Sequence, residues 1–142
     1  MKNIKKQNGF TLVEVMIVVV IIGILVGLAV PRFTRATVKA KQTEAKLILK
    51  QIYTMQQTYR EEYDTYWTPS EGVLASAENP DAFGELGIEL MKEARYTYSI
   101  VGNDRTFTAV ATAVNLDNDE TEDKWQIDQD GTLIALSDDA RQ

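Results

Sequence analysis

The 142-residue chain has 15 lysine and arginine residues against 21 aspartate and glutamate residues, which gives a formal net charge of -6. This acidic balance argues against a general affinity for nucleic acid phosphates. The sequence contains neither cysteine nor histidine. Disulfide frameworks, thiolate metal sites, histidine-ligated zinc and histidine-based catalytic triads are therefore excluded, and much of the usual enzymatic repertoire with them.

The N-terminus combines a short polar segment with a long apolar run. Residues 1–9 are polar and basic, and residues 10–30 are apolar except for Thr11 and Glu14. The basic residues of the first segment are Lys2, Lys5 and Lys6. As a helix the run is ~30 Å long, which matches the hydrocarbon core of a bilayer. Because basic residues stay on the cytoplasmic side, we expect the rest of the chain to lie outside.

An ordinary secretory signal fits this N-terminus poorly. Such signals have an apolar region of roughly 7–15 residues that ends at a small-residue cleavage site. Here the run is longer, and its A-x-A-like triplet, Leu28-Ala29-Val30, is followed directly by Pro31.

The helical pattern continues after residue 31, from about Phe33 to Tyr63. Apolar side chains recur there at steps of three and four, which predicts an amphipathic helix with one apolar face. That face is expected to contain Ile48, Ile52, Met55, Tyr59 and Tyr63. We therefore predict a single helix of roughly 80 Å, with a membrane half at 10–31 and an amphipathic half at 32–64.

The remaining residues predict a small antiparallel sheet. Residues 65–94 are irregular, with prolines and glycines that are typical of loops. Residues 95–142 contain alternating apolar and polar runs, separated by turn signals at Gly102-Asn103-Asp104 and Asp130-Gly131. We expect three or four strands, with one face of the sheet covering the helix. The predicted fold class is α+β.

The segment Gly9-Phe10-Thr11-Leu12-Val13-Glu14, with the apolar run and Pro31, resembles the type IV pilin and type II secretion pseudopilin superfamily. The resemblance implies that a prepilin peptidase removes leader residues 1–9 by cutting between Gly9 and Phe10. It also implies that the new Phe10 amine is N-methylated. The mature subunits then leave the inner membrane and polymerise into a helical fibre whose centre is a bundle of N-terminal helices.

Glu14 is the candidate assembly residue. A carboxylate inside a membrane-length apolar run costs ~3 kcal/mol on insertion scales, so it usually has a partner. In the precursor, Glu14 can stay near the lipid headgroups or be protonated. In a packed fibre an unpaired buried charge is strongly destabilising. The family resemblance implies a partner there, the Phe10 amine of a neighbouring subunit, and this pair fixes the axial register.

Gly23, Gly27 and Pro31 allow two interpretations. Glycine is common in membrane helices, and proline frequently marks their exit. Glycine is also a poor helix former, and proline leaves a helical carbonyl unpaired. The resemblance therefore implies local melting of the helix between Gly23 and Pro31 during assembly.

Charge is distributed unevenly beyond the apolar run. Residues 32–60 are mainly basic, whereas residues 115–139 are mainly acidic. These regions are either two solvated surfaces or complementary contacts between subunits. The acidic run also suggests a calcium site, because hard cations prefer several oxygen ligands. Its candidate ligands are Asp117, Asp119, Thr121 and Asp123. A plain acidic turn is the alternative, and no other cofactor is expected.

Three functions follow from these features, and none of them is enzymatic. The first is a surface pilin for adhesion, motility or DNA uptake, with nucleic acid as a partner only in DNA uptake. The second is a pseudopilin of a type II secretion system, located in the periplasm. The third is a membrane-anchored binding domain that never polymerises. For the first two, the resemblance implies other pilins, the prepilin peptidase, an assembly platform and an ATPase motor as partners.

Overall fold

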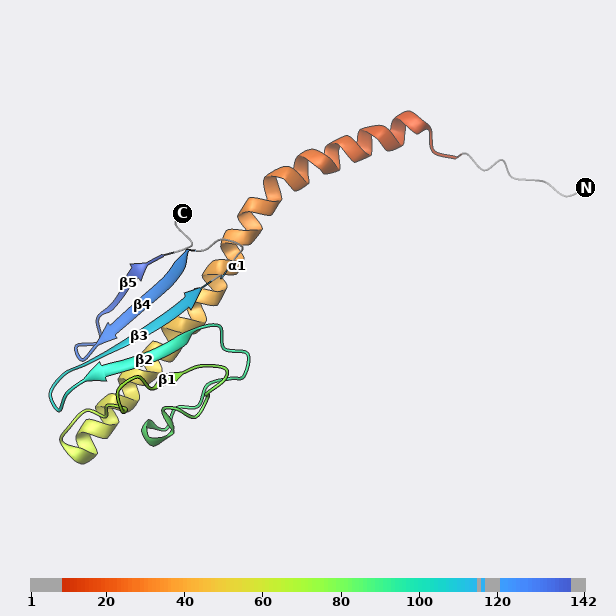
Figure 1. Cartoon of the computed structure of the whole chain (residues 1–142). Helices are drawn as coiled ribbons and strands as arrows, with labels where there is room; N and C mark the ends of the chain where they lie inside the picture. Colours follow the sequence, from red (N-terminus) through yellow and green to blue (C-terminus); the bar gives the residue numbers. More distant parts are fainter. Residues whose placement is uncertain (1–8, 115, 117–120, 139–142) are drawn as a thin grey trace, which may run out of the picture. The chain divides into compact units, whose positions relative to one another are not determined.

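The structure is a computed structural model that describes residues 9–114, 116 and 121–138. It has one long helix and five strands, and this confirms the predicted α+β class (Figure 1). The elements are α1 (Leu12–Tyr63), β1 (Leu74–Ala75), the 3-10 turn η1 (Gly84–Leu86), β2 (Thr97–Gly102), β3 (Phe107–Val114), β4 (Glu122–Asp128) and β5 (Leu133–Ser137). The chain divides into two compact units, one up to Arg35 and one from Ala36 onward.

The N-terminal unit contains the first half of α1 and has no core of its own. Its large apolar side chains, from Leu12 to Val30, are all exposed. Within the described part of the chain, α1 is the one helix that is long and apolar enough to cross a membrane, and none of its apolar window is buried. A lipid bilayer or other copies of this segment are needed to cover this surface.

The second unit, which we call the head, is built on an antiparallel sheet with strand order β1-β2-β3-β4-β5. Tyr98 pairs with Ala111, Ala111 with Trp125, and Trp125 with Ala135. The chain folds back after β2 at Gly102, where an added Cβ would lie 2.3 Å from the Thr106 carbonyl oxygen. Only glycine fits this hairpin without a shift of the backbone.

The helix packs on the sheet through a row of residues spaced four and three apart. The row comprises Val38, Gln42, Ala45, Leu49, Ile52 and Gln56, all buried. The apolar face that the sequence predicted does not coincide with this buried row. Of its members only Ile52 is fully buried, Ile48, Met55 and Tyr59 are half-buried, and Tyr63 is 56% exposed. The periodicity of apolar residues missed the centre of the face because two of its positions are glutamines.

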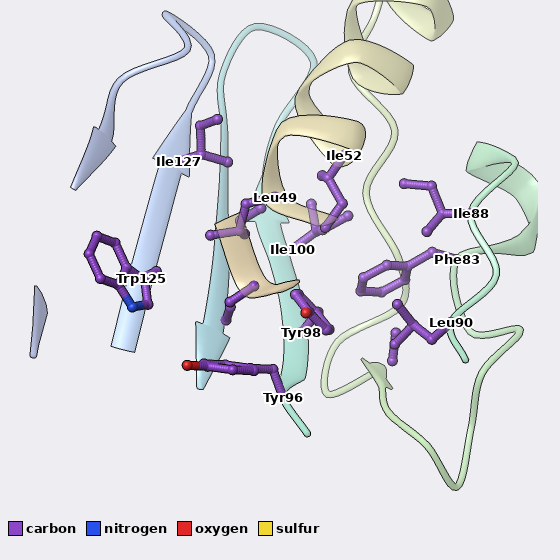
Figure 2. Close-up of a cluster of buried hydrophobic side chains, with 14 of the residues drawn as sticks. Leu49, Ile52, Phe83, Ile88, Leu90, Tyr96, Tyr98, Ile100, Trp125 and Ile127 are labelled. Carbon is purple, nitrogen blue, oxygen red and sulfur yellow. The ribbon is translucent and has the colours of Figure 1, made fainter. Parts of the chain in front are cut away.

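The loop that connects α1 to the sheet also contributes buried residues to the core. Phe83, Ile88 and Leu90 are buried. In the view of Figure 2, Leu49 of α1 lies between the sheet residues Ile127 and Ile100, and Ile52 lies between Ile100 and the loop residue Ile88. The irregular loop therefore contributes buried side chains to the same core as the helix and the sheet.

Candidate functional site

The predicted cleavage site lies immediately before the helix. Gly9 and Phe10 have no regular secondary structure, and α1 begins at Leu12. Phe10 is 86% exposed, and no atom lies within 4 Å of a Cβ placed on Gly9. The peptide bond between them is therefore accessible, and packing does not explain the glycine. Cleavage and N-methylation at these residues stay predictions.

Thr11 and Glu14 form a reciprocal cap at the start of α1. The Glu14 backbone N–H donates to the Thr11 hydroxyl oxygen at 3.2 Å. The Thr11 backbone N–H and hydroxyl each donate to Glu14 Oε2 at 3.3 Å. This is a capping box, which satisfies two backbone donors that a helix terminus otherwise leaves free. Glu14 therefore has a local partner in the single chain.

Thr11 is the site residue that the sequence argument missed. In the sequence the threonine was noted as a polar interruption of the apolar run and as part of the motif from Gly9 to Glu14, without a role of its own. The signal was present, because threonine followed three residues later by glutamate, before an apolar segment, is the sequence pattern of a capping box. The family motif contains the same two residues, and its functional interpretation concealed the local one.

Gly23, Gly27 and Pro31 all lie within α1, which continues through them. An added Cβ at either glycine would meet no atom within 4 Å. Proline lacks the N–H that would otherwise bond the Gly27 carbonyl, so this turn has one fewer backbone hydrogen bond. One helical turn further on, the Thr34 hydroxyl donates to the Val30 carbonyl at 3.2 Å. Melting of this segment on assembly stays a prediction.

A buried polar cluster holds the C-terminal part of the head to α1. Asp123 is fully buried and accepts hydrogen bonds from the Gln42 amide at 2.7 Å, the Tyr96 hydroxyl at 2.6 Å and the Trp125 indole N–H at 2.7 Å. The Gln42 amide also donates to Asp138 at 2.9 Å. Burial, followed by the hydrogen bond to Asp123, raises the pKa of Tyr96 well above its usual value.

Several basic side chains of α1 contact the head rather than solvent alone. The Lys41 ammonium donates to the Leu116 carbonyl, and the Lys46 ammonium lies 3.8 Å from the centre of the Trp125 ring. Arg60 donates to the Tyr66 hydroxyl at 2.7 Å. With the Asp123 cluster, these contacts tie residues 116, 123 and 138 to the helix in a chain that has no cysteine for a disulfide.

Two of the four predicted calcium ligands, Thr121 and Asp123, belong to the described residues. Asp117 and Asp119 lie outside the described part of the chain, and Thr121 is half-buried. Both carboxylate oxygens of Asp123 already accept hydrogen bonds from protein donors. The Asp123 carboxylate is thus engaged with the protein in this structure, and calcium binding by Asp123 and the rest of the loop stays a prediction.

Comparison with known proteins places the N-terminal segment in a family. Residues 4–30 match the family described as the prokaryotic N-terminal methylation motif. The type IV major pilin protein PilA of Myxococcus xanthus is 38% identical over 95 residues, which cover 67% of this chain and 37% of that protein. The type II secretion system core protein G of Pseudomonas aeruginosa is 38% identical over 76 residues, 54% of each chain.

These relatives include both a type IV pilin and a type II secretion protein, and the family match itself covers residues 4–30 of the chain. A third relative, the narrow pilus major component PilA5 of Thermus thermophilus, is 60% identical over 37 residues, which cover 26% of this chain and 32% of that protein. The pilin-like chain thus spans between about a third and about half of these relatives' lengths. No solved structure matches it.

Proposed function

We propose that the chain is a structural subunit of a type IV pilus-like fibre and that it polymerises through residues 10–31 after cleavage at Gly9. The observation that supports this most is the N-terminal unit, in which residues 12–30 of the methylation-motif segment present exposed apolar side chains interrupted by one carboxylate, that of Glu14. Such a surface suits storage in a membrane and, after extraction, burial in a bundle of identical helices.

The fibre would give the Glu14 carboxylate a cationic partner, whereas its partner in the single chain, Thr11, is neutral. Cleavage creates a positive amine at Phe10, and a bundle excludes the water that would otherwise solvate Glu14. A buried charge that loses its partner costs several kcal/mol, so a pair between neighbouring copies would favour one axial register over others. The proposed partners are other pilins, the prepilin peptidase, an assembly platform and an ATPase motor.

A pseudopilin of a type II secretion system is the second candidate. It is favoured by the core protein G relatives, which match the chain over about half of both lengths. It also agrees with a head that has no cysteine to staple its C-terminal region. The major pilin PilA relative covers more of the chain, 67%, and we therefore give the pilin first place.

Mass spectrometry of intact protein and peptides tests both candidates. Fibres are sheared from the cell surface and compared with the membrane fraction of the same cells. A dominant chain that begins at Phe10 in the sheared fraction, with one added methyl group, would establish a surface pilin. The same mature chain confined to the envelope would favour the pseudopilin.

The third outcome contradicts both fibre functions. An uncut chain that begins at Met1 and remains in the envelope would leave a membrane-anchored domain as the explanation. A Gly9→Val variant provides the matched control, because it should block cleavage without changing the residues of the mature chain. Its precursor should accumulate in the membrane, and fibres should be absent.

A further inference from the structure

The end of α1 borders a groove that no step of the proposed assembly uses. The groove has a volume of about 240 Å³ and lies between the last two turns of α1 and the turn η1. Its lining includes Met55, Tyr59, Glu62 and Tyr63 from the helix and Glu85 and Gly87 from the turn. None of the residues that line it is basic.

Two tyrosine rings form one wall of this groove. The ring centres of Tyr59 and Tyr63 lie 4.5 Å apart with an angle of 30° between the ring planes. Tyr63 is 56% exposed, so an incoming group can reach its ring. Beside it, the Glu62 carboxylate raises the pKa of Tyr63, first through a side-chain hydrogen bond and then through its charge.

The opposite wall is held in place by the backbone of the turn. Gly87 has φ of 73°, which favours glycine, and an added Cβ there would lie 3.1 Å from Met55 Cε. The Glu85 carboxylate accepts a hydrogen bond from the Trp67 indole N–H at 2.8 Å and is held by it. The groove thus combines two aromatic faces with two carboxylates, an arrangement that attracts a planar cation such as guanidinium.

No basic side chain lines this groove in the described chain, and the basic residues in the head's part of α1 include several with contacts elsewhere. Arg60 is the nearest basic residue on the helix, but its guanidinium lies over the Tyr66 ring and donates to the Tyr66 hydroxyl. Lys41 and Lys46 contact Leu116 and Trp125. Among the described residues of α1, Arg32 and Arg35 are exposed arginines that make no hydrogen bond or ion pair, and they precede the head.

We propose that this groove binds an arginine, Arg32 or Arg35, from a second copy of the chain. The inference rests on the proposed function, because it names a contact between heads and helices within the fibre. The groove and the arginines lie on different parts of the chain, so the contact is heterologous. Heterologous contacts repeat from one subunit to the next and build open filaments rather than closed dimers.

Cysteine cross-linking in assembled fibres tests the contact. The chain has no cysteine of its own, so introduced pairs react without background. Thr58 lines the groove, and Ala36 follows Arg35; both are exposed. A chain with Thr58→Cys and Ala36→Cys keeps the tyrosines, carboxylates and arginines. Treatment of its fibres with a short bismaleimide should produce a ladder of covalent oligomers on a denaturing gel.

A matched control pair measures chance collisions. Val101 is 71% exposed in β2 and does not line the groove, so Val101→Cys with Ala36→Cys should give little ladder. Adding Arg32→Ala and Arg35→Ala to the groove pair should lower the cross-linked yield about fivefold, as expected for loss of one cation–aromatic contact with a carboxylate nearby. Adding Lys50→Ala should leave the yield unchanged.

The outcomes separate this inference from the proposed function. If fibres form but the groove pair cross-links no better than the Val101 pair, the groove contact is wrong and the fibre function stands. A ladder that is unaffected by loss of both arginines also overturns the contact. If the cysteine-free parent chain forms no fibres, the proposed function and the groove contact fail together.

Discussion

Glu14 has a partner in the single chain and is proposed to take another in the fibre. In the single chain it completes the capping box with Thr11. In the proposed fibre it pairs with the Phe10 amine of a neighbour. The two roles make different chemical demands, because a glutamine at this position also completes a capping box, whereas only a carboxylate neutralises an amine.

Replacement of Glu14 by glutamine therefore distinguishes the two roles. We expect Glu14→Gln to insert in the membrane and be cleaved normally but to yield no sheared fibres, because the register-setting charge is gone. Thr11→Val is the control. It removes the hydroxyl of the cap at a cost of ~1 kcal/mol in helix stability but leaves the carboxylate, so fibres should persist. Normal fibre yield in the glutamine variant would show that Glu14 acts only as a cap.

Tyr96 and Tyr98 form a second pair of residues with contrasting roles. Both are buried in β2, two positions apart. The Tyr96 hydroxyl donates to Asp123 at 2.6 Å, whereas among the described residues the Tyr98 hydroxyl has no hydrogen-bond partner. A buried hydroxyl without a partner costs free energy, and a hydrogen bond to a carboxylate stabilises.

Removal of each hydroxyl should change stability in opposite directions. Tyr96→Phe is expected to lower the free energy of unfolding of the head by ~2 kcal/mol, because Asp123 loses a donor in a buried site. Tyr98→Phe is expected to be neutral or to stabilise. Urea unfolding of the detergent-solubilised full chain, followed by tryptophan fluorescence, measures both. Equal losses in the two variants would mean that Asp123 does not depend on Tyr96.

At the scale of elements, α1 is fixed to the head by two buried glutamines. Gln42 reaches Asp123 and Asp138. Gln56 pairs with the backbone of Trp67, donating to its carbonyl at 2.7 Å and accepting from its N–H at 2.9 Å. Gln56 therefore acts as a strand partner would and satisfies both polar groups of a buried backbone unit.

Replacement of Gln56 by an apolar side chain should lower the free energy of unfolding, because it removes this pairing. Gln56→Leu has a suitable size and suits the helix, but it leaves the Trp67 N–H and carbonyl unpaired in the core. We expect the free energy of unfolding to fall by ~3 kcal/mol. Gln51→Leu, at an exposed position of the same helix, should change it by less than ~0.5 kcal/mol. A small effect of Gln56→Leu in urea unfolding would contradict the pairing.

The same glutamines mark the limit of prediction from the sequence. The order of elements and the turn at Gly102 followed from periodicity and turn residues. The buried row of α1 could not be predicted in this way. Sequence patterns place a glutamine on the surface unless its buried partner is known. Its partners, Trp67 and Asp123, are brought to it only by the register of the folded head.

The candidate assembly segment was more predictable than the head. Gly9, Phe10 and Glu14 are adjacent in sequence, and the family match to residues 4–30 rests on that segment alone. In contrast, the aromatic groove combines residues of α1 with residues of η1 that lie more than 20 positions further along. From periodicity alone these tyrosines belong to a packing face of the helix, because periodicity does not place the turn beside them.

At the scale of the whole molecule, the two units should respond differently to their surroundings. The N-terminal unit buries none of its apolar surface, whereas the head buries a continuous core. Detergent or membrane composition should therefore change the behaviour of the first unit. The stability of the head should depend instead on its buried polar groups. A change of pH affects these groups by changing their ionisation.

Alkaline pH should destabilise the head through its buried tyrosines. Burial raises the pKa of Tyr96 and of Tyr98 above the ordinary value of 10.0, with added contributions from Asp123 and Glu44 respectively. Below pH ~10 both states keep these protons, and the stability is fully present. As the pH rises further, the unfolded chain releases protons that the folded head retains. Each tyrosine then lowers the free energy of unfolding by ~1.4 kcal/mol per pH unit.

Tyr98→Phe isolates this effect, because it removes one raised pKa and leaves the hydrogen bond between Tyr96 and Asp123 in place. Urea unfolding of the full chain between pH 8 and about pH 11 should show a steep loss of stability above pH ~10 in the parent and a shallower loss in Tyr98→Phe. Lysine titration is common to both chains and cancels in the comparison. Parallel profiles would show that Tyr98 is open to solvent in the folded head, since only a buried phenol resists ionisation in this way.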